Sequence, residues 1–366
     1  MSFVIHSKHP CGGDQLFLTE ISYPKIIPDK ANGAENVATF REEVSSYHWV
    51  GQNLATDSFD CEKSLVTFSN DSCTPGGIGH ALCHEFHRRG LHVIATARDF
   101  SVLADLAEAG MSTVQMDVTD PISIQNCHKT VSELTNGRLD ILVNNAGRTH
   151  VHPALDLSIP DVRSTFEVNV FGVMAVVAAF ADLLITAKGL IINIASLAAL
   201  TSYVFGSAYC ASKGAVVSYS RTLRQELRPL GVRVMVCMVG VVRSNVHNRE
   251  HRSLPPTSVY LPVQDVYKAR LQFANRSDAV DTPVFAETVV SSALKSEVPW
   301  FLRTWVGRPD WLWCGTMARP LWWGYSFLGE WLIDYPLENS FAPLIYNISG
   351  LSQIMDVKER RNDLEV

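Results

Sequence analysis

Short apolar runs separated by amphipathic stretches recur through residues 64–250, and this alternation constrains the fold more than any other feature. A first run begins at Ser64, and the later ones are five to seven residues long: Leu91–Ala97, Ser112–Met116, Leu139–Val143, Leu190–Ile194 and Val232–Met238. Buried strands that alternate with helices pair in parallel, because each helical crossover returns the chain to the same end of the sheet. We therefore predict an α/β fold with a doubly wound parallel sheet, whose ligand lies at the carboxyl ends of the strands.

The composition excludes two classes of protein. With 47% hydrophobic and 19% charged residues, the 366-residue chain is globular rather than disordered. A net charge of -6 offers no basic surface for nucleic acid, so we expect no nucleic-acid partner. The eight cysteines show no Cys-x-x-Cys pairing. We therefore predict no metal site, no disulfide framework and a reducing compartment.

A glycine-rich turn precedes the first helical run. Gly76–Gly79 lie just before residues 81–86, and such a turn gives the backbone freedom and helix N-terminal N–H groups that a phosphate cradle requires. The second strand ends at Arg98 rather than at an acidic residue. An arginine there suits the 2'-phosphate of NADPH, whereas a carboxylate would bind the ribose hydroxyl of NADH. We therefore predict NADPH as the cofactor, and a solvated surface arginine is the alternative interpretation of Arg98.

Tyr209 and Lys213 are four residues apart in an expected helix, so their side chains share one face. The lysine ammonium favours the tyrosinate, and we expect it to lower the pKa of the phenol toward neutrality. Ser196 closes a buried run and can reach the same carbonyl oxygen of a substrate. One hydroxyl then transfers a proton while the other stabilises developing charge, which predicts acid-base chemistry at a carbonyl group.

These motifs, with three others, resemble the short-chain dehydrogenase/reductase family over residues 63–250. The three are Asp117-Val118, Asn144-Asn145-Ala146-Gly147 and Asn169-Val170-Phe171-Gly172. The resemblance implies a Rossmann fold and an NADP-dependent oxidoreductase. Within the family, the paired glycines after Cys73-Thr74-Pro75, the stretch Ser196–Ala199 and the Trp/Phe-rich tail are similar to the fungal NADPH-dependent acyl-dihydroxyacetone-phosphate reductase branch.

The resemblance also implies site residues. Asn169 joins Ser196, Tyr209 and Lys213 in a catalytic tetrad, where it holds a water that connects Lys213 to solvent. At the adenosine end, the implied cofactor contacts are Arg98 at the 2'-phosphate, Asp117 and Val118 at the adenine, and Asn144 at the adenosine ribose. Gly76, Gly77, Ile78 and Gly79 contact the phosphates, and Gly240, Val242 and Ser244 contact the nicotinamide. The other implied cofactor-binding residues are Ala146, Gly147, Tyr209 and Lys213.

Two positions depart from the family pattern. The family carries Thr-Gly directly after the first strand, whereas this chain continues through Phe68–Ser72 without that glycine. Either Ser72 takes its place, or Phe68–Ser72 enlarge the turn, or the start of the sequence or an internal junction is imperfect. Val239 replaces the usual proline before Gly240, which alters the stiffness of the loop rather than the chemistry.

Composition divides the chain into three parts. Residues 1–60 form an extension of unknown role without a sustained helical or strand period, and residues 61–295 form the expected reductase domain. Residues 296–366 hold seven of the eight tryptophans. Their longest uncharged apolar stretch is shorter than the ~20 residues that span a bilayer. We expect this segment to be a substrate lid, a dimer contact or a membrane-interface contact.

The sequence thus predicts an enzyme that reduces a ketone of an apolar or lipid-like substrate with NADPH, and the branch implies acyl-dihydroxyacetone phosphate. The alternative is a tailoring reductase of secondary metabolism that acts on a polyketide or terpenoid ketone. A non-catalytic protein of the same fold and a membrane-recruitment scaffold are further hypotheses. We expect a cytoplasmic enzyme, and the similarity to the branch implies a peripheral location on the endoplasmic reticulum or lipid-droplet surface. The family resemblance implies a dimer or tetramer formed by the helices that carry Asn169 and Tyr209, unless the tail blocks this packing.

Overall fold

The computed structural model describes residues 64–68, 73–244, 253–272, 278–299 and 306–327. The N-terminal extension 1–60, positions 69–72 of the altered turn and the tail beyond residue 327 lie outside the described residues. The hypotheses made for these segments therefore stay predictions.

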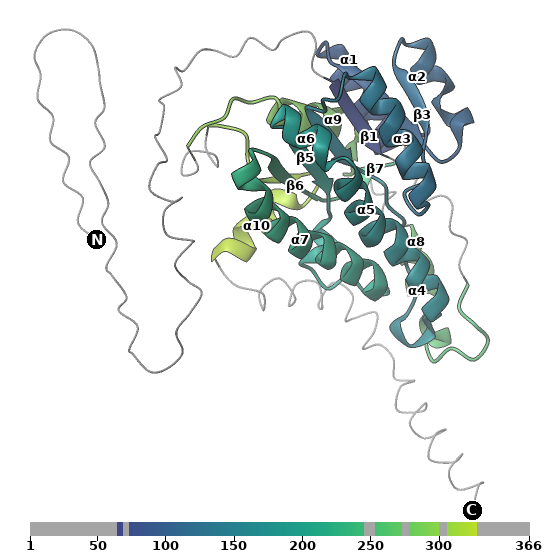
Figure 1. The fold of residues 1–366 in the computed structure, drawn as a ribbon. Helices are drawn as coiled ribbons and strands as arrows, with labels where there is room; N and C mark the ends of the chain where they lie inside the picture. The colour runs from purple at the N-terminus through teal and green to yellow at the C-terminus, as the bar shows by residue number, and fades with distance from the viewer. Residues whose placement is uncertain (1–63, 69–72, 245–252, 273–277, 300–305, 328–366) are drawn as a thin grey trace, which may run out of the picture. The chain divides into compact units, whose positions relative to one another are not determined.

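Among the described residues, seven parallel strands form the main sheet, in the order β3-β2-β1-β4-β5-β6-β9. Figure 1 labels β1, β3, β5 and β6 of this sheet. They are β1 (Ser64–Phe68), β2 (His92–Ala97), β3 (Ser112–Gln115), β4 (Ile141–Asn144), β5 (Leu190–Ile194), β6 (Arg233–Val239) and β9 (Trp311–Cys314). A two-stranded sheet pairs β7 (Val242–Arg243) with β8 (Val280–Asp281). The prediction of a doubly wound parallel sheet is confirmed, and the predicted strand ends differ from the observed ones by at most two residues.

The helices occupy the intervals between the strands. They are α1 (Ile78–Arg88), α2 (Ala104–Glu108), α3 (Pro121–Leu134), α4 (Ile159–Phe166), α5 (Gly172–Ala179), α6 (Ala181–Ala187), α7 (Ser207–Leu227), α8 (Gln264–Leu271), α9 (Thr282–Ala293) and α10 (Ala318–Phe327). In the described ranges, short 3-10 turns and one π-helical segment, Glu167–Phe171, connect several of them.

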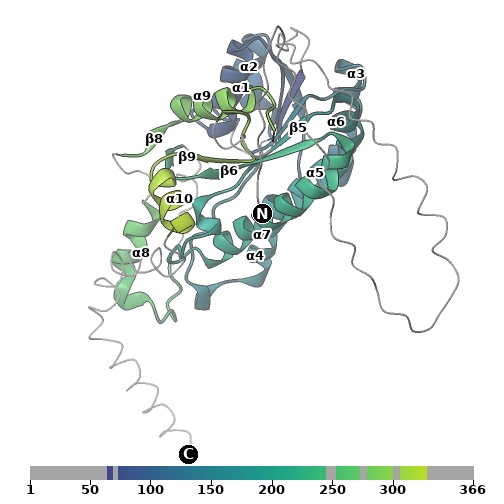
Figure 2. The same cartoon turned by 90° about the vertical axis from the view of Figure 1, so that its left-hand side faces the viewer.

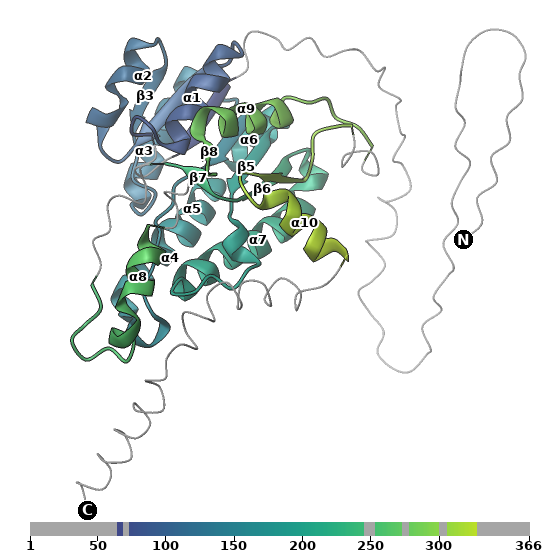
Figure 3. The same ribbon diagram turned by 180° about the vertical axis from the view of Figure 1, so that it is seen from behind.

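Helices cover both faces of the sheet, because successive strand side chains point to opposite sides. Within β2, Val93 and Ala95 pack with α1, α2 and α9, whereas Ile94 packs with α3, α5 and α7. Figure 2 shows α1, α2 and α9 on one side of the sheet and α5 and α7 on the other. On the first side, α1 and α9 lie next to each other (Figure 3). Both faces of the strands are therefore buried, which explains their nearly continuous apolar composition.

The strand order reverses between β1 and β4. The chain moves outward from β1 to β2 and β3, then returns to the other side of β1 and continues through β4, β5 and β6. In an open parallel sheet the crevice at such a reversal, beyond the carboxyl ends of the strands, is where ligands bind. The fold therefore places the candidate site at the ends of β1, β4, β5 and β6.

The sheet continues into the Trp-rich segment. Residues Trp311–Cys314 form β9 and pair with β6, with Cys237 opposite Leu312. The Arg224 side chain of α7 lies over the Trp311 ring at 5.2 Å and donates a hydrogen bond to Asp310 O. The end of the sheet therefore lies beyond residue 295, the boundary expected from composition.

One helical stretch, Ile159–Ala179, is long and apolar enough to cross a membrane by length and composition, among the residues that the structure describes. It comprises α4, the π-helical segment and α5. Val173, Val176 and Val177 are buried against the sheet. Burial in the core accounts for the apolar character of this stretch.

Candidate active site

Three of the four predicted catalytic residues meet beyond the carboxyl end of β5. Ser196 follows this strand as the N-cap of the turn Leu197–Ala199, where its Oγ accepts a hydrogen bond from Ala198 N–H (3.2 Å). Tyr209 and Lys213 lie one turn apart near the start of α7, as their spacing predicted. All three side chains line the same hollow.

Asn169, the fourth residue, lies behind this wall in the π-helical segment and is buried. Its Oδ1 accepts a hydrogen bond from Arg148 N–H (2.7 Å). Its Nδ2 donates to Arg148 O (3.0 Å) and to Ser212 Oγ (3.0 Å). A π-helical turn changes the direction of the side chains that follow and is frequent at functional sites. Here it lets one amide tie the chain after β4 to α7 beside the catalytic residues.

Lys213 is only 5% exposed, and its Nζ donates a hydrogen bond to Ile194 O (2.9 Å). A Cβ atom added to Gly147 would lie 3.6 Å from this Nζ and 3.8 Å from Asn169 Oδ1, so the backbone at Gly147 lies next to both groups. Burial lowers the pKa of Lys213 to about 8. The ammonium therefore keeps its proton in most molecules at neutral pH.

The structure corrects the expected pKa of Tyr209. We expected Lys213 to lower it, but burial raises the pKa of Tyr209 to about 12 and outweighs the hydrogen bond with Ser196, which lowers it. The Lys213 ammonium lies 5.9 Å from the centre of the tyrosine ring and donates to a carbonyl, so it does not offset the loss of water around the phenol. A phenol with a raised pKa holds its proton at neutral pH, which suits a proton donor.

The hollow has a volume of about 1290 Å³, including its open mouth. Apolar side chains from distant segments line it, among them Val151 after β4, Val239 and Val241 at the end of β6 and just beyond it, and Met317 and Leu321 at the start of α10. An apolar wall of this kind accommodates an apolar substrate next to a few polar groups that fix its orientation.

The predicted cofactor residues fall into two groups. Those that line the hollow are Ile78, Gly147, Tyr209, Lys213, Gly240, Val242 and Ser244. Those outside its lining are Gly76, Gly77, Gly79, Arg98, Asp117, Val118, Asn144 and Ala146. The second group belongs to the start of α1 and to the ends of β2, β3 and β4, along the same edge of the sheet. The contacts of both groups with a dinucleotide stay predictions.

The glycine turn and Arg98 fit the predicted NADPH. Gly76 has a φ of 80°, a conformation that glycine adopts without strain. Gly77 is the N-cap of α1 and has no side chain that could bond to the first N–H groups of this helix, which leaves them oriented toward an anion. Arg98 is exposed directly after β2, where a 2'-phosphate would lie.

Asn144 has a different environment from the one that its predicted role suggests. It is buried, and its Nδ2 donates to Asn193 Oδ1 (2.8 Å). Asn193 in turn donates to Ser220 Oγ (2.8 Å). This side chain thus connects β4 to β5 and α7 in the core, and its contact with the adenosine ribose stays a prediction.

Val118 packs behind the site rather than in the hollow. It is 4% exposed, and a Cβ atom added to Gly172 would lie 2.8 Å from Val118 Cγ2. Asp117 accepts hydrogen bonds at Oδ1 from the N–H and hydroxyl of Thr119. The predicted adenine contacts of Asp117 and Val118 stay predictions.

Sequence reasoning missed a charged group in the wall of the hollow. Arg148 donates to Asp161 Oδ1 (2.6 Å), and His150 Nε2 lies 3.4 Å from Asp161 Oδ2. Arg148 and His150 line the hollow, and His150 is 1% exposed. The available signal was position, since Arg148 directly follows the Asn144–Gly147 motif at the end of a buried strand.

Sequence reasoning also missed the contribution of the chain after β9. Thr316 lies against the loop after β6, and a Cβ atom added to Gly240 would lie 2.0 Å from Thr316 O. Gly240 thus lies against another part of this chain, and its predicted contact with the nicotinamide stays a prediction. Met317 and Leu321 then continue the wall of the hollow.

This chain is similar in sequence to known proteins. The family model described as short chain dehydrogenase matches residues 74–254. The short-chain dehydrogenase srdE of Neurospora crassa is 43% identical over 290 residues, which cover 79% of this chain and 94% of the relative. The NADPH-dependent 1-acyldihydroxyacetone phosphate reductase of Schizosaccharomyces pombe is 38% identical over 255 residues, covering 67% and 84%.

A solved structure agrees with the fold. A short-chain dehydrogenase from Streptomyces avermitilis has a TM-score of 0.60 at 23% identity, and the match covers 80% of this chain and 97% of that one. The family resemblance that the motifs indicated is confirmed. This chain belongs to the short-chain dehydrogenase family and is an oxidoreductase.

Proposed function

We propose that this enzyme reduces a ketone of an apolar, lipid-like molecule to an alcohol. The observation that carries the proposal is the convergence of Ser196, Tyr209 and Lys213 on one wall of a mostly apolar hollow. The cofactor is NADPH, in agreement with the exposed Arg98 after β2 and with the NADPH-dependent S. pombe relative. NADPH supplies a hydride for the carbonyl carbon.

The residues of the chain supply the proton and the alignment. Tyr209, whose raised pKa keeps the phenol protonated, donates its proton to the carbonyl oxygen. Ser196 donates a second hydrogen bond to this oxygen and stabilises the charge that develops on it. The Lys213 ammonium lies behind the phenol, and Asn169 holds the backbone of Arg148 against this region. Ketone, NADPH and one proton thus give an alcohol and NADP⁺.

The lining of the hollow supports a substrate with both an apolar and an anionic part. Val151, Met317 and Leu321 offer apolar contacts, and Arg148 adds a guanidinium that also pairs with Asp161, while no carboxylate occurs among the described lining residues. The S. pombe relative is named for 1-acyldihydroxyacetone phosphate, which combines an acyl chain, a ketone and a phosphate. We take this molecule as the first substrate to test, and polyketide or terpenoid ketones as the competing class.

The location of the enzyme is part of the proposal. Trp323 of α10 is 58% exposed, Met317 is 40% exposed, and Arg319 between them is exposed. Aromatic and cationic side chains together suit the headgroup region of a bilayer. A peripheral location on the endoplasmic reticulum or on lipid droplets would bring the mouth of the hollow close to a lipid substrate. Co-flotation of the enzyme with liposomes, lost in Trp323→Ala, tests this location.

Turnover assays test the activity. The purified enzyme should oxidise NADPH with an acyl-dihydroxyacetone phosphate and much more slowly with dihydroxyacetone phosphate, which lacks the apolar chain. Tyr209→Phe should keep NADPH binding and lower turnover by at least ~100-fold, because it removes only the transferable proton. Turnover of polyketide or terpenoid ketones alone would move the substrate to the competing class. Unchanged turnover in Tyr209→Phe would exclude the proposed role of this residue.

A further inference from the structure

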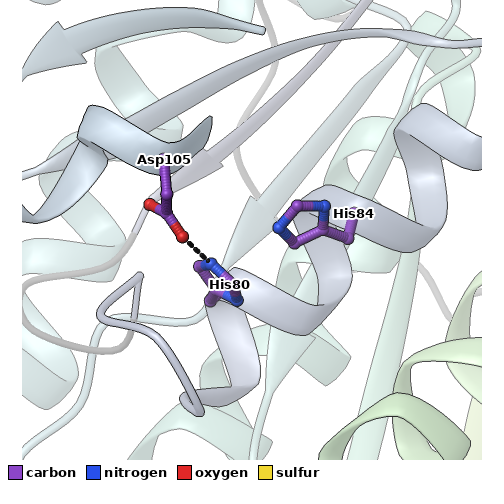
Figure 4. A group of neighbouring side chains, drawn as sticks. All are labelled: His80, His84 and Asp105. Atoms are coloured by element: carbon purple, nitrogen blue, oxygen red, sulfur yellow. Dashed lines mark hydrogen bonds and ion pairs between the residues drawn. The ribbon is translucent and has the colours of Figure 1, made fainter. Parts of the chain in front are cut away.

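Two histidines and an aspartate face one another on the outer side of α1, away from the hollow. His80 and His84 are one turn apart on α1, and Asp105 comes from α2 (Figure 4). One ligand atom from each of the three side chains lies within 4.8 Å of the other two. In the part of the chain that the structure describes, no other group of three such side chains comes together this way.

The contacts within this cluster hold the side chains in position. His80 Nε2 lies 2.5 Å from Asp105 Oδ2, and the His80 and His84 rings meet edge to face with centroids 4.6 Å apart. His80 is largely covered, whereas His84 is exposed and Asp105 is partly exposed. The cluster is therefore open to solvent on the His84 side.

These donors match the ligand preferences of a zinc-class ion. Imidazole nitrogens and a carboxylate oxygen bind Zn²⁺ at ~2.0–2.2 Å, so neighbouring ligand atoms of a tetrahedral site lie ~3.3 Å apart. The His80–Asp105 pair must open slightly, and the exposed His84 ring must turn inward, to reach this spacing.

The charge around the cluster is compatible with a cation. A helix N-terminus disfavours positive charge, and His80 lies in the first turn of α1, but the Asp105 carboxylate supplies an opposing negative charge. The nearest arginines of α1, Arg88 and Arg89, form ion pairs with Glu85. These arginines therefore already have a carboxylate partner of their own.

We propose that His80, His84 and Asp105 form a binding site for a divalent transition-metal ion of the zinc class, with water completing the coordination. The ion fastens α1 to α2. The predicted phosphate-binding glycines lie just before α1 and in its first turn, and α2 follows the chain that starts at Arg98. The ion therefore stabilises the two elements on either side of the predicted adenosine end of the cofactor site. The site is structural, since it lies outside the hollow that holds the catalytic residues.

Metal titration of the full-length, chelator-treated enzyme tests the proposal. Co²⁺ should bind with the visible absorption of a nitrogen and oxygen site and without thiolate charge-transfer bands, and Zn²⁺ should displace it. His84→Ala should weaken this binding by at least ~10-fold and remove the Zn²⁺-dependent increase in Tm. Because His84 is exposed, the variant should fold, which circular dichroism would verify.

His87→Ala is the matched control, because His87 is an exposed histidine on the same helix outside the cluster. It should bind Co²⁺ and Zn²⁺ as the unmodified enzyme does. Asp105→Asn should also weaken binding, since it removes the charged ligand. The proposal is overturned if His84→Ala and His87→Ala bind equally, if the spectrum shows thiolate ligands, or if no metal binds. The last outcome would leave His80 and Asp105 as an ion pair only.

Discussion

Lys213→Met should change how the stability of the enzyme depends on pH. Burial lowers the pKa of Lys213 from 10.5 to about 8, and each pKa unit corresponds to ~1.4 kcal/mol, so the charged side chain costs the fold ~3 kcal/mol near pH 7. Between the two pKa values the unfolded chain holds a proton that the folded chain has released. Stability therefore rises with pH in this window.

The two pKa values of Lys213, 10.5 in the unfolded chain and about 8 in the folded chain, set the size of this change in stability. Between pH ~7 and pH ~9.5, the cost of the charged Lys213 falls by ~2 kcal/mol. Lys213→Met has no such titration, so the free energy of unfolding of the original enzyme should rise relative to the variant by this amount. The substitution also removes the hydrogen bond from Lys213 Nζ to Ile194 O, so the comparison uses the change in the free energy of unfolding between the two pH values and not its absolute size. Ionisation of Tyr209, near pH 12, lies outside the window.

Urea unfolding of both proteins without cofactor, at the two pH values, provides the measurement. Lys268→Met is the matched control, because the Lys268 side chain is 61% exposed and should leave the pH dependence unchanged. If the original enzyme and Lys213→Met showed parallel pH dependence, the pKa of Lys213 would not be depressed. The account of burial at this position would then be refuted.

Three further substitutions test the packing around the site. Gly240→Ala should lower the Tm strongly, because the added Cβ would lie 2.0 Å from Thr316 O. An unchanged Tm in calorimetry would show that the loop after β6 can move away from Thr316. Gly214 lies inside α7, and a Cβ atom added there would meet its nearest atom at 3.8 Å. Because alanine has a higher helix propensity than glycine, Gly214→Ala should stabilise the enzyme by ~0.5–1 kcal/mol in urea unfolding, and destabilisation would contradict this argument. Asn193→Ala leaves Asn144 without its acceptor in the core and should cost ~1–3 kcal/mol; a loss below this range would mean that water replaces the amide.

Local patterns were sufficient to predict most of the sheet. Runs such as Leu190–Ile194 are buried on both faces and are therefore apolar throughout, which makes them visible in the sequence. β9 was missed because it is an edge strand with half-buried residues at three of its four positions, and its partner β6 lies about 70 residues earlier in the chain. Tryptophans in such a strand resemble those of a surface segment until the pairing is known.

Only the locally determined part of the candidate site could likewise be predicted from the sequence. The Tyr209–Lys213 pair was predictable because one helical turn fixes its geometry. The Arg148–Asp161 contact was not, since the two residues come from a loop and a helix that only the folded chain brings together. The direction of the Tyr209 pKa was also wrong, because it depends on burial that the spacing of two residues does not reveal.

Burial has reversed the usual order of the two pKa values in the site, and this reversal predicts the pH profile of catalysis. Lysine normally keeps its proton to a slightly higher pH than tyrosine, but here Lys213 loses its proton near pH 8 while Tyr209 holds its own until near pH 12. The phenol is therefore ready to donate a proton at any physiological pH, which favours reduction, whereas the ammonium is lost first. We expect kcat/KM for ketone reduction, which reports on the free enzyme, to fall as pH rises through about 8. A profile measured with NADPH and the ketone that stayed level to pH ~10 would show that catalysis does not need the charge on Lys213.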